Sequence, residues 1–475
     1  MRVIQNHIGG QKLPAASGQT LDDIEPATDR VWTTIPDSDA LDVDVAVAAA
    51  KAAQPAWAQL GVAARCDVLQ QAAVLLEQRL DAFAALESRD TGKPVSLTTA
   101  TDIPRAVANL RFFADLARNE PEERHAMDTH TNLTHRAPVG VVGLITPWNL
   151  PLYLLSWKLA PALAMGNAVV AKPSELTPAT ADALASLLEE AGLPPGVFNV
   201  VHGLGAKAGD ALVRHPAVQA ISFTGGTATG KMVAAAAAPM FKKLSLELGG
   251  KNPAVVFADS DLDVAVPGVA RAAFTNQGQV CLCSSRILVE ASIYDAFRNR
   301  LMAEVATWKH GDPGDSTVRL GSLISQDHRD KVAGYVDQAA ESGARVLCGG
   351  QKQDGPGAFY PITLIDGVAQ SDPIVQEEVF GPVATLQPFS DEAEALRLAN
   401  DVPYGLAATV WTTDAAKAQR FSEGLETGMV WVNDWLKRDL RVPFGGMKQS
   451  GVGREGGTHS LDFYSELRNL CLENP

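Results

Sequence analysis

A cysteine in a polar loop is the first residue that could do chemistry. Cys281 ends the segment FTNQGQVC at residues 274–281, where an apolar helical pattern gives way to glycine and amide side chains. Such a loop can present a thiol to a cleft, and the thiolate is the nucleophile in cysteine chemistry. The alternative is a buried, inert cysteine, because free cysteine is among the most buried residue types. Cys283 would point the same way in an extended segment, but this spacing is not that of a metal-binding cysteine pair.

Glu247 and Asn149 are the next candidates, because each ends an apolar strand pattern. Glu247 lies in the segment LSLELGGK at residues 244–251, and a buried carboxylate has a raised pKa that suits a general base near neutral pH. The alternative is a carboxylate paired with an arginine. Asn149 lies in TPWNLP at residues 146–151, where two prolines fix the turn. A rigidly held amide can donate to a developing oxyanion, although an asparagine here could instead cap the next helix.

Two further loops are compatible with a dinucleotide. The segment KPSE at residues 172–175 puts an acidic residue after a strand, where dinucleotide folds hold the adenosine ribose. The segment FTGGTATGK at residues 223–231 places small residues before a helix, whose free N–H groups can bind phosphate. The glycine-rich segment at residues 203–209 is one residue too long for the G-x-G-x-x-G motif. Taken singly, each pattern is also compatible with an ordinary turn.

The elements that must position these residues alternate along the chain. The strand patterns at 139–145, 168–171, 197–201 and 220–223 are separated by helical patterns at 152–165, 177–191 and 207–213. This alternation predicts a parallel sheet with helices on both faces, which binds ligands beyond the carboxyl ends of its strands.

A second series of alternating elements begins near Pro253, so we expect a domain change around residues 246–250. Its predicted strands are at 254–257, 382–388, 406–411 and 429–433, with a helix at 262–275. Residues 118–138 interrupt the first series. Three histidines there, His125, His130 and His135, recur at five-residue spacing and are predicted to be solvated loop residues.

Composition narrows the classes of partner. The 475 residues carry a formal net charge of −15, so neither nucleic acid nor an anionic membrane surface is an expected partner. The N-terminal residues have no apolar core typical of a signal peptide, and no apolar run approaches the ~20 residues of a membrane span. Five scattered cysteines predict a reducing, cytoplasmic location and no disulfide framework. No metal site is predicted.

Taken together, the motifs resemble those of the aldehyde dehydrogenase superfamily. Besides the segments above, the chain carries EEVFGP at residues 377–382, and the resemblance covers essentially its whole length. Gly226 departs from the pattern, because many members carry serine there. The resemblance implies an α/β fold with a Rossmann-like parallel-sheet cofactor domain, a second α/β catalytic domain and a small β oligomerisation element. The implied ranges are 1–117 and 139–246 for the first, 247–457 for the second, and 118–138 with 458–475 for the element that would form a homodimer or homotetramer.

The resemblance also implies a role for each site residue. Cys281 would add to the aldehyde carbonyl, Asn149 would hold the oxyanion together with the Cys281 N–H, and hydride transfer to NAD would leave a thioester. Glu247 would activate the water that hydrolyses this thioester. Cys283 would line the pocket. Lys172 and Glu175 would hold the adenosine ribose, Glu378 would hold the nicotinamide ribose, and Phe380 would pack beside it. The remaining residues expected at the cofactor are Thr146, Pro147, Trp148, Ser174, Gly225, Gly226 and Leu248.

Two arginines suggest the kind of aldehyde. Arg105 and Arg438 lie in segments that resemble the branch acting on 2-aminomuconic and 2-hydroxymuconic semialdehydes, in which matching arginines hold the carboxylate at the far end of the substrate. A guanidinium suits this task because its planar fork makes bidentate bonds to a carboxylate. Each arginine could instead form a surface salt bridge, which we expect for Arg111 and Arg441. The alternatives for the protein are a dehydrogenase of another aldehyde, such as betaine aldehyde or an aliphatic one, and an inactive structural or binding member of the fold.

Overall fold

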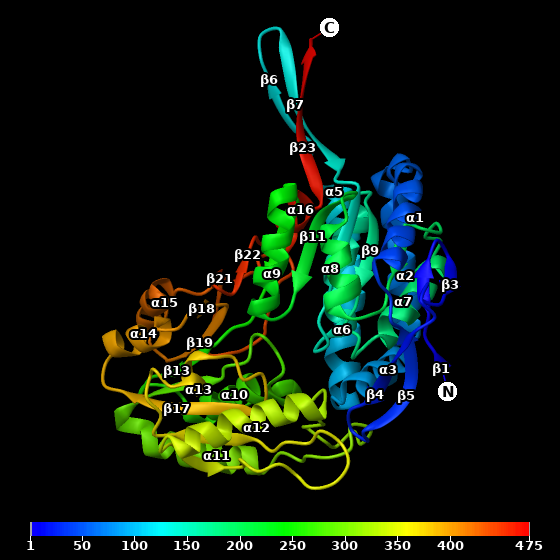
Figure 1. Ribbon diagram of the computed structural model, residues 1–475. Coiled ribbons are helices and arrows are strands. Elements are labelled where there is room, and N and C mark those ends of the chain that lie inside the picture. The colour runs from blue at the N-terminus through cyan, green and yellow to red at the C-terminus, as the bar shows by residue number, and fades with distance from the viewer. Residues whose placement is uncertain (1, 475) are drawn as a thin grey trace.

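The protein, described here as a computed structural model of residues 2–474, has two large sheets, one small projecting sheet and two further small sheets (Figure 1). Helices lie against both large sheets, which confirms the predicted α/β class. The projecting sheet extends away from the body of the molecule and carries the C-terminal strand. Within residues 2–474, no helix combines the length and the apolarity needed to cross a membrane.

The first sheet has a parallel centre with antiparallel strands at its edges. Its strands in spatial order are β22 (Gly451–Val452), β12 (Lys243–Glu247), β11 (Val218–Thr224), β8 (Val141–Ile145), β9 (Ala168–Lys172), β10 (Phe198–Val200), β2 (Asn6–Ile8) and β3 (Gln11–Leu13). Every residue of β8 and β9 is buried, as expected for parallel strands that are covered on both faces. The register pairs Ile145 with Lys172 and Thr224 with Glu247, so the predicted site residues leave the sheet along one edge.

Two groups of helices cover the two faces of this sheet. Alternate residues of β8 belong to different cores: Val142 and Leu144 pack with α2, α5, α6 and α7, whereas Val141 and Ile145 pack with α1 and α8. The helices on the first face are α2 (Gly61–Gln78), α5 (Ile103–Asn119), α6 (Pro151–Ala164) and α7 (Ala179–Glu190). The other helices near this sheet are α1 (Ala40–Gln59), α3 (Leu80–Thr91), α4 (Val95–Leu97), η1 (Thr98–Asp102), η2 (Gly205–Gly209), α8 (Asp210–Arg214), α9 (Thr227–Ala237), η3 (Ala238–Met240) and α16 (Gly457–Phe463).

The helix predicted over 207–213 is divided. Residues 205–209 form a turn of π-helix, and α8 begins only at Asp210. A glycine at each end of the π turn explains the break, because glycine weakens a regular helix.

The second sheet is parallel except at one edge. Its strands in spatial order are β15 (Arg345–Cys348), β16 (Thr363–Asp366), β17 (Val383–Phe389), β14 (Arg286–Glu290), β13 (Pro253–Val256), β19 (Ala407–Trp411) and β20 (Met429–Val432). The helices around it are α10 (Leu262–Phe274), η4 (Thr275–Gly278), η5 (Ala291–Ile293), α11 (Tyr294–Ala306), α12 (Gln326–Glu341), α13 (Pro373–Gln376), α14 (Glu392–Asn400) and α15 (Ala415–Gly424).

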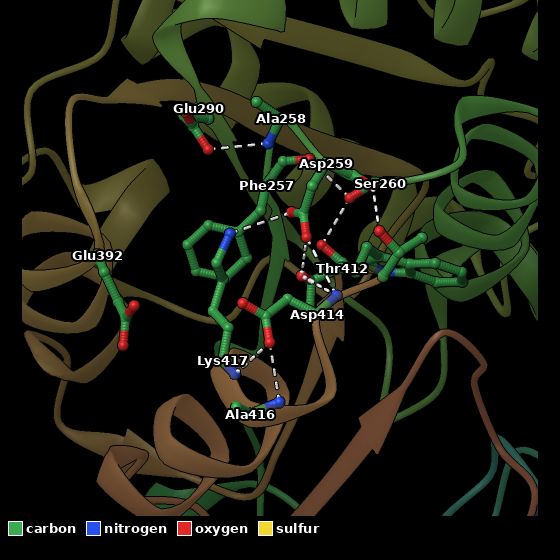
Figure 2. Close-up of polar contacts among 12 residues, drawn as sticks. Phe257, Ala258, Asp259, Ser260, Glu290, Glu392, Thr412, Asp414, Ala416 and Lys417 are labelled. Atoms are coloured by element: carbon green, nitrogen blue, oxygen red, sulfur yellow. Dashed lines mark hydrogen bonds and ion pairs between the residues drawn. The ribbon is translucent and has the colours of Figure 1, made fainter.

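The carboxyl edge of the second sheet is closed by polar side chains that bond to one another (Figure 2). Asp259, beyond β13, accepts hydrogen bonds from the Thr412 hydroxyl at 2.6 Å and from the Asp414 backbone N–H at 3.1 Å, and it pairs with Lys417 Nζ at 3.2 Å. Asp414 in turn caps α15. This edge is therefore tied together by its own residues.

The amino edge of the second sheet, opposite the edge just described, lies against the first sheet. Only residues 248–252 separate the end of β12 from the start of β13, so the carboxyl edge of the first sheet and the amino edge of the second lie together. The loop that carries Cys281 also arrives at this amino edge, because β14 begins at Arg286. The site therefore lies between the two sheets.

The projecting sheet consists of β6 (Glu123–Ala126), β7 (His130–Pro138) and β23 (Ser465–Glu473). The prediction that three histidines lie in a loop is wrong, since His125 belongs to β6 and both His130 and His135 belong to β7. The period-two pattern was hidden because β6 is exposed along its whole length. The remaining strands form the two further small sheets. One consists of β1 (Arg2–Val3), β5 (Arg30–Pro36) and β4 (Thr20–Glu25), and the other of β18 (Tyr404–Gly405) and β21 (Met447–Lys448).

Candidate active site

The loop before Cys281 has a left-handed backbone that requires glycine. Asn276, Gln277 and Gly278 have φ angles of 53°, 55° and 70°, and a Cβ on Gly278 would lie 2.0 Å from the Gly381 carbonyl oxygen. The glycine therefore lets the Cys281 loop pass directly against the 377–382 segment. Cys281 is partly exposed, unlike the buried Cys283, so the structure does not favour the inert alternative.

The Asn149 side chain lies against the same loop. Its Nδ2 donates to the Gln279 carbonyl at 2.9 Å, two residues before Cys281. The residue at the N-cap position of α6 is Leu150, so Asn149 does not cap this helix. The backbone N–H of Cys281 lies beside its own sulfur. The geometry thus brings an amide donor, a backbone donor and a thiol into one small region.

Glu247 has a buried carboxylate. Neither of its oxygens has a hydrogen-bond partner within residues 2–474, so pairing with an arginine is not observed. Burial raises the pKa of Glu247 well above its ordinary value, and the nearby Glu455 charge raises it further. A Cβ on Gly445 would lie 3.0 Å from Glu247 Oε1, which shows how closely the loop after Phe444 covers this carboxylate.

The sequence analysis did not predict a buried ion pair that lies near Glu247. Lys158 Nζ lies 2.7 Å from Glu455 Oε1, and the Ser222 and Ser245 hydroxyls each donate to the same oxygen at 3.0 Å. The signal was available, because Lys158 is the one charged residue in the otherwise uncharged and fully buried helix α6.

The surroundings of Cys281 disfavour its thiolate. Burial raises the pKa of the Cys281 thiol, and the charges of Glu378 and Glu247 raise it further. The pKa of Cys283 is also raised by burial, to about 12. Cys283 Sγ lies 3.7 Å from the Thr275 carbonyl oxygen and packs with Val280 and Leu282. Its side chain therefore packs against other residues of the same loop.

The residues expected at the adenosine end lie along the carboxyl edge of the first sheet. Lys172 Nζ pairs with Glu175 Oε2 at 2.7 Å, and the Ser174 hydroxyl accepts from the Leu176 N–H beside them. Gly226 is the N-cap residue of α9, and a Cβ there would meet no atom within 4 Å. The Thr224 hydroxyl is buried without a hydrogen-bond partner among residues 2–474. Open space at a helix N-terminus beside a free hydroxyl fits a diphosphate.

Leu248 and Gly225 connect the N-terminus of α9 to Glu247. A Cβ on Gly230 of α9 would lie 2.5 Å from Leu248 Cδ2, so the absent side chain lets the helix pack directly on Leu248. The Gly225 N–H donates to the Glu247 carbonyl at 3.1 Å. The N-terminus of α9 and Glu247, the candidate base, are therefore joined by direct packing and by a hydrogen bond.

The residues expected at the nicotinamide end gather on the other side of Cys281. Glu378 Oε1 accepts from the Gly250 N–H at 3.1 Å, and a Cβ on Gly249 would overlap the same carboxylate. The Phe380 ring meets Trp148 edge to face at a centroid distance of 5.3 Å. The His328 ring also contacts Trp148 at 5.3 Å, and its Nε2 lies 2.7 Å from the Phe380 carbonyl oxygen. Thr146 and Pro147 form the turn between β8 and Trp148.

Arg438 is held between aromatic rings with free donors. Its guanidinium carbon lies 4.2 Å from the centre of the Trp157 ring and 4.0 Å from that of Phe444. Its Nε and Nη2 are buried and have no hydrogen-bond partner within residues 2–474. Burial is the main cause that lowers the pKa of Arg438, and the nearby positive charge of Arg105 lowers it further. Neither arginine forms a salt bridge among the described residues.

Tyr153, Trp157 and Phe444 are further pocket residues that sequence reasoning did not select. Arg105 Nε donates to the Tyr153 hydroxyl at 3.2 Å and lies over the same ring. Aromatic residues are common in apolar cores, so their types alone gave no signal. By contrast, Arg111 pairs with Glu77 at 2.6 Å and Arg441 pairs with Asp439 at 2.5 Å, both at the surface as expected.

Comparison with known proteins identifies a family, relatives and solved structures that are similar to this chain. Residues 13–470 match the model of the aldehyde dehydrogenase family. A 2-aminomuconic semialdehyde dehydrogenase from Danio rerio is 48% identical over 99% of this chain and 98% of its own length. A 2-hydroxymuconic semialdehyde dehydrogenase from a Pseudomonas species is 46% identical over the full length of both chains. Among solved structures, the NAD⁺ complex of an aldehyde dehydrogenase from Bacillus cereus superposes with a TM-score of 0.97 at 36% identity, covering 100% of this chain and 97% of that one.

Proposed function

This chain belongs to the aldehyde dehydrogenase family, and we propose that it oxidises a semialdehyde that carries a carboxylate, with NAD as the hydride acceptor. The proposed substrates are of the 2-aminomuconic or 2-hydroxymuconic semialdehyde type, the aldehydes named in the relatives that match over the whole chain. The product is the corresponding dicarboxylic acid.

The free donors of Arg438 are the observation that supports this substrate class. A buried N–H group without a partner costs free energy, so a site that keeps two of them is suited to a ligand that accepts hydrogen bonds. The Trp157 and Phe444 rings hold the guanidinium plane in place, which favours a planar acceptor such as a carboxylate. Arg105, beside Tyr153, adds a second positive charge. A neutral aldehyde would leave these groups unsatisfied.

The proposed chemistry begins at the thiol. Cys281 Sγ forms a bond to the aldehyde carbon as its proton passes to a water molecule. The carbonyl π electrons move to the oxygen, which becomes an oxyanion held by the Asn149 amide and the Cys281 N–H. A bound NAD would supply the hydride acceptor for this carbon, and loss of the hydride would leave the acyl group on Cys281 as a thioester. Glu247 then takes a proton from a water molecule that attacks the thioester. The C–S bond then breaks, the acid leaves, and the Cys281 sulfur takes the proton back from Glu247.

The residues present fit an NAD molecule along the first sheet. Gly226 and the N-terminus of α9 would take the diphosphate, and Lys172 with Glu175 would take the adenosine ribose. A carboxylate at Glu175 would repel a 2′-phosphate, which favours NAD. Glu378 and Phe380 would hold the nicotinamide end beside Cys281, together with Trp148.

We further propose a cytoplasmic homodimer or homotetramer. All five cysteines are free thiols, which suits a reducing compartment. The projecting sheet exposes Leu467 and Leu472 at more than half of their surface, a pattern that fits contact with another copy of the chain. The proposed division into domains keeps residues 1–117 with 139–246, then 247–457, with 118–138 and 458–475 as the assembly element.

Substitution of Arg438 tests the substrate class. We expect Arg438→Met to raise KM for 2-hydroxymuconic semialdehyde about 10- to 150-fold, the effect of losing a charged hydrogen bond of ~1.5–3 kcal/mol. KM for a neutral aldehyde of similar length should change less than about threefold. NADH formation at 340 nm measures both reactions.

Arg441→Met is the matched control, because this nearby arginine is paired with Asp439 at the surface. Equal losses on both aldehydes in Arg438→Met would contradict the carboxylate role. A preference for betaine aldehyde or an aliphatic aldehyde would favour the alternative substrates, and the absence of NADH with any reactive aldehyde would favour an inactive member of the family.

A further inference from the structure

A buried ionic cluster lies behind the Asn149 backbone. Glu87 of α3, Lys93 in the following loop and Asp102 at the end of η1 are each at most 1% exposed. Lys93 Nζ lies 2.6 Å from Asp102 Oδ2 and 3.9 Å from Glu87 Oε1. The cluster is outside the set of residues to which the proposed reaction assigns a step.

The Lys93 ammonium makes a further hydrogen bond, to the peptide of Asn149. Lys93 Nζ donates to the Asn149 carbonyl oxygen at 2.8 Å. Asn276 Nδ2, from the Cys281 loop, donates to the same oxygen at 3.1 Å. Glu87 accepts from the Leu152 N–H at 3.4 Å, at the start of α6. The short turn that carries Asn149 is therefore held by groups from two separate parts of the chain, residues 87–93 and the Cys281 loop.

The carbonyl and the side-chain amide belong to the same residue, so contacts that anchor the Asn149 carbonyl restrict the directions in which its amide can point. Its Nδ2 already donates toward the Cys281 loop, and rotation of the peptide behind it would swing the amide away from the thiol. Burial of a lysine and two carboxylates is costly, and an apolar cluster would fill the same space at lower cost. An ammonium and an amide that meet on one carbonyl provide a rigidity that apolar packing lacks.

We propose that Lys93 and Asn276 are positioning residues that hold the Asn149 amide toward the oxyanion formed at Cys281. Asp102 keeps the Lys93 ammonium in place. This inference rests on the roles of Cys281 and Asn149 in the proposed function, but it does not depend on the identity of the aldehyde.

The test uses acylation of Cys281 by p-nitrophenyl acetate, which needs the thiol and the oxyanion donors but neither semialdehyde nor dinucleotide. Release of p-nitrophenolate from the full-length protein gives the acylation rate. We expect Lys93→Met to lower this rate about 10- to 100-fold and to leave the affinity for NAD unchanged. Lys93→Gln should retain more activity than Lys93→Met, because an amide can still donate to the carbonyl.

A double-mutant cycle separates positioning from general damage. Asn149→Ala should lower acylation about 10²- to 10³-fold, as expected for an oxyanion donor. In the Asn149→Ala background, Lys93→Met should change the rate less than twofold, because the amide that it positions is gone. Additive losses would overturn the proposal.

Two further variants complete the design. Lys242→Met is the control, since Lys242 is also buried and donates to two backbone carbonyls, those of Val213 and His215, away from Asn149. It should keep the wild-type acylation rate. If Lys93→Met does not fold, Asn276→Gly takes its place, because glycine keeps the left-handed backbone of Asn276 and removes the donor.

The outcomes distinguish the two proposals. A normal rate in Asn149→Ala would overturn both the oxyanion assignment and this inference. Losses in Asn149→Ala with a normal rate in Lys93→Met or its Asn276→Gly substitute would overturn the inference alone. A non-additive cycle in a protein that does not oxidise carboxylate-bearing semialdehydes would support the inference and contradict the proposed substrate.

Discussion

The thiol of Cys281 is surrounded by groups that keep it protonated. Burial raises its pKa, and Glu378 and Glu247 add to the shift when they are ionised. The pKa of Glu378 is itself raised by burial, to about 7, so its carboxylate gains charge as the pH passes neutrality. We therefore expect Cys281, the proposed nucleophile, to be mainly a thiol at neutral pH in the free protein.

Alkylation of Cys281 tests this electrostatic environment. Because the thiolate is the reactive form, we expect the rate of reaction with iodoacetamide to keep rising up to at least about pH 9, beyond the ordinary cysteine pKa of about 8.5. Mass spectrometry of the peptide that contains Cys281 follows the reaction, and a free cysteine derivative in the same solution serves as the reference. A rate that levels off below pH 8 would contradict the predicted shift.

Glu247 is expected to control release of the acid. Its raised pKa means that its basic form appears only as the pH rises through that value, so hydrolysis of the thioester should speed up with pH. Glu247→Gln should slow this step about 10²- to 10⁴-fold and abolish its dependence on this group. Rapid-quench mass spectrometry should then detect an acylated Cys281.

The control for this prediction is Glu392→Gln, which changes a carboxylate paired with Arg420 at the carboxyl edge of the second sheet. It should hydrolyse the thioester at the normal rate. If Glu247→Gln accumulates no acyl-enzyme and its turnover is unimpaired, another group is the base.

At the level of elements, the site depends on loops that approach one another closely. The left-handed turn at Asn276, Gln277 and Gly278 passes the Cys281 loop against Gly381. Phe380, two residues from Glu378, also has a positive φ of 61° and lies against Trp148. Strained backbone at both loops, outside the regular strands, is typical of functional sites.

Substitution of Gly278 should disrupt this contact. Gly278→Ala forces a side chain into the left-handed region, which costs roughly 1–3 kcal/mol, and adds an overlap with the Gly381 carbonyl. We expect a lower melting temperature and a loss of NADH formation. Gly226→Ala is the control for the melting temperature alone, because its φ is −68° and a Cβ there meets open space in the protein without cofactor. Equal stability of the two variants would contradict the predicted role of the turn.

At the level of the whole molecule, the projecting sheet is the part that contributes least to the site. It extends from the body of the protein (Figure 1) and exposes leucines on β23. Sheets with exposed apolar side chains and unpaired edges commonly form contacts with other chains.

Acidic substitutions on β23 test the predicted assembly. Leu467→Glu together with Leu472→Glu should shift the protein toward monomers in size-exclusion chromatography with light scattering, because charges oppose burial. Leu41→Glu is the control, since Leu41 is 62% exposed on α1 and outside the projecting sheet. An unchanged mass in the double variant would contradict a role for this sheet in assembly.

The sequence by itself predicted the α/β class and the strands that end in the candidate site residues. These patterns are local: β8 and β9 are buried along their whole length and appear as continuous apolar runs, and the motifs follow their ends directly. The sequence could not show that β6 and β7 form a sheet, because their exposed faces carry no apolar alternation.

Only the tertiary structure decided which side chains meet. The structure shows that Asn149 does not cap α6, because its amide donates to the Gln279 carbonyl, 130 positions away. It also shows that neither carboxylate oxygen of Glu247 has a hydrogen-bond partner within residues 2–474. Lys93, Lys158 and Arg438 are cations of one net acidic chain, yet each is enclosed by residues from distant segments. Charge and residue type can be read along the chain, whereas burial and partnership arise only when the edges of the two sheets come together.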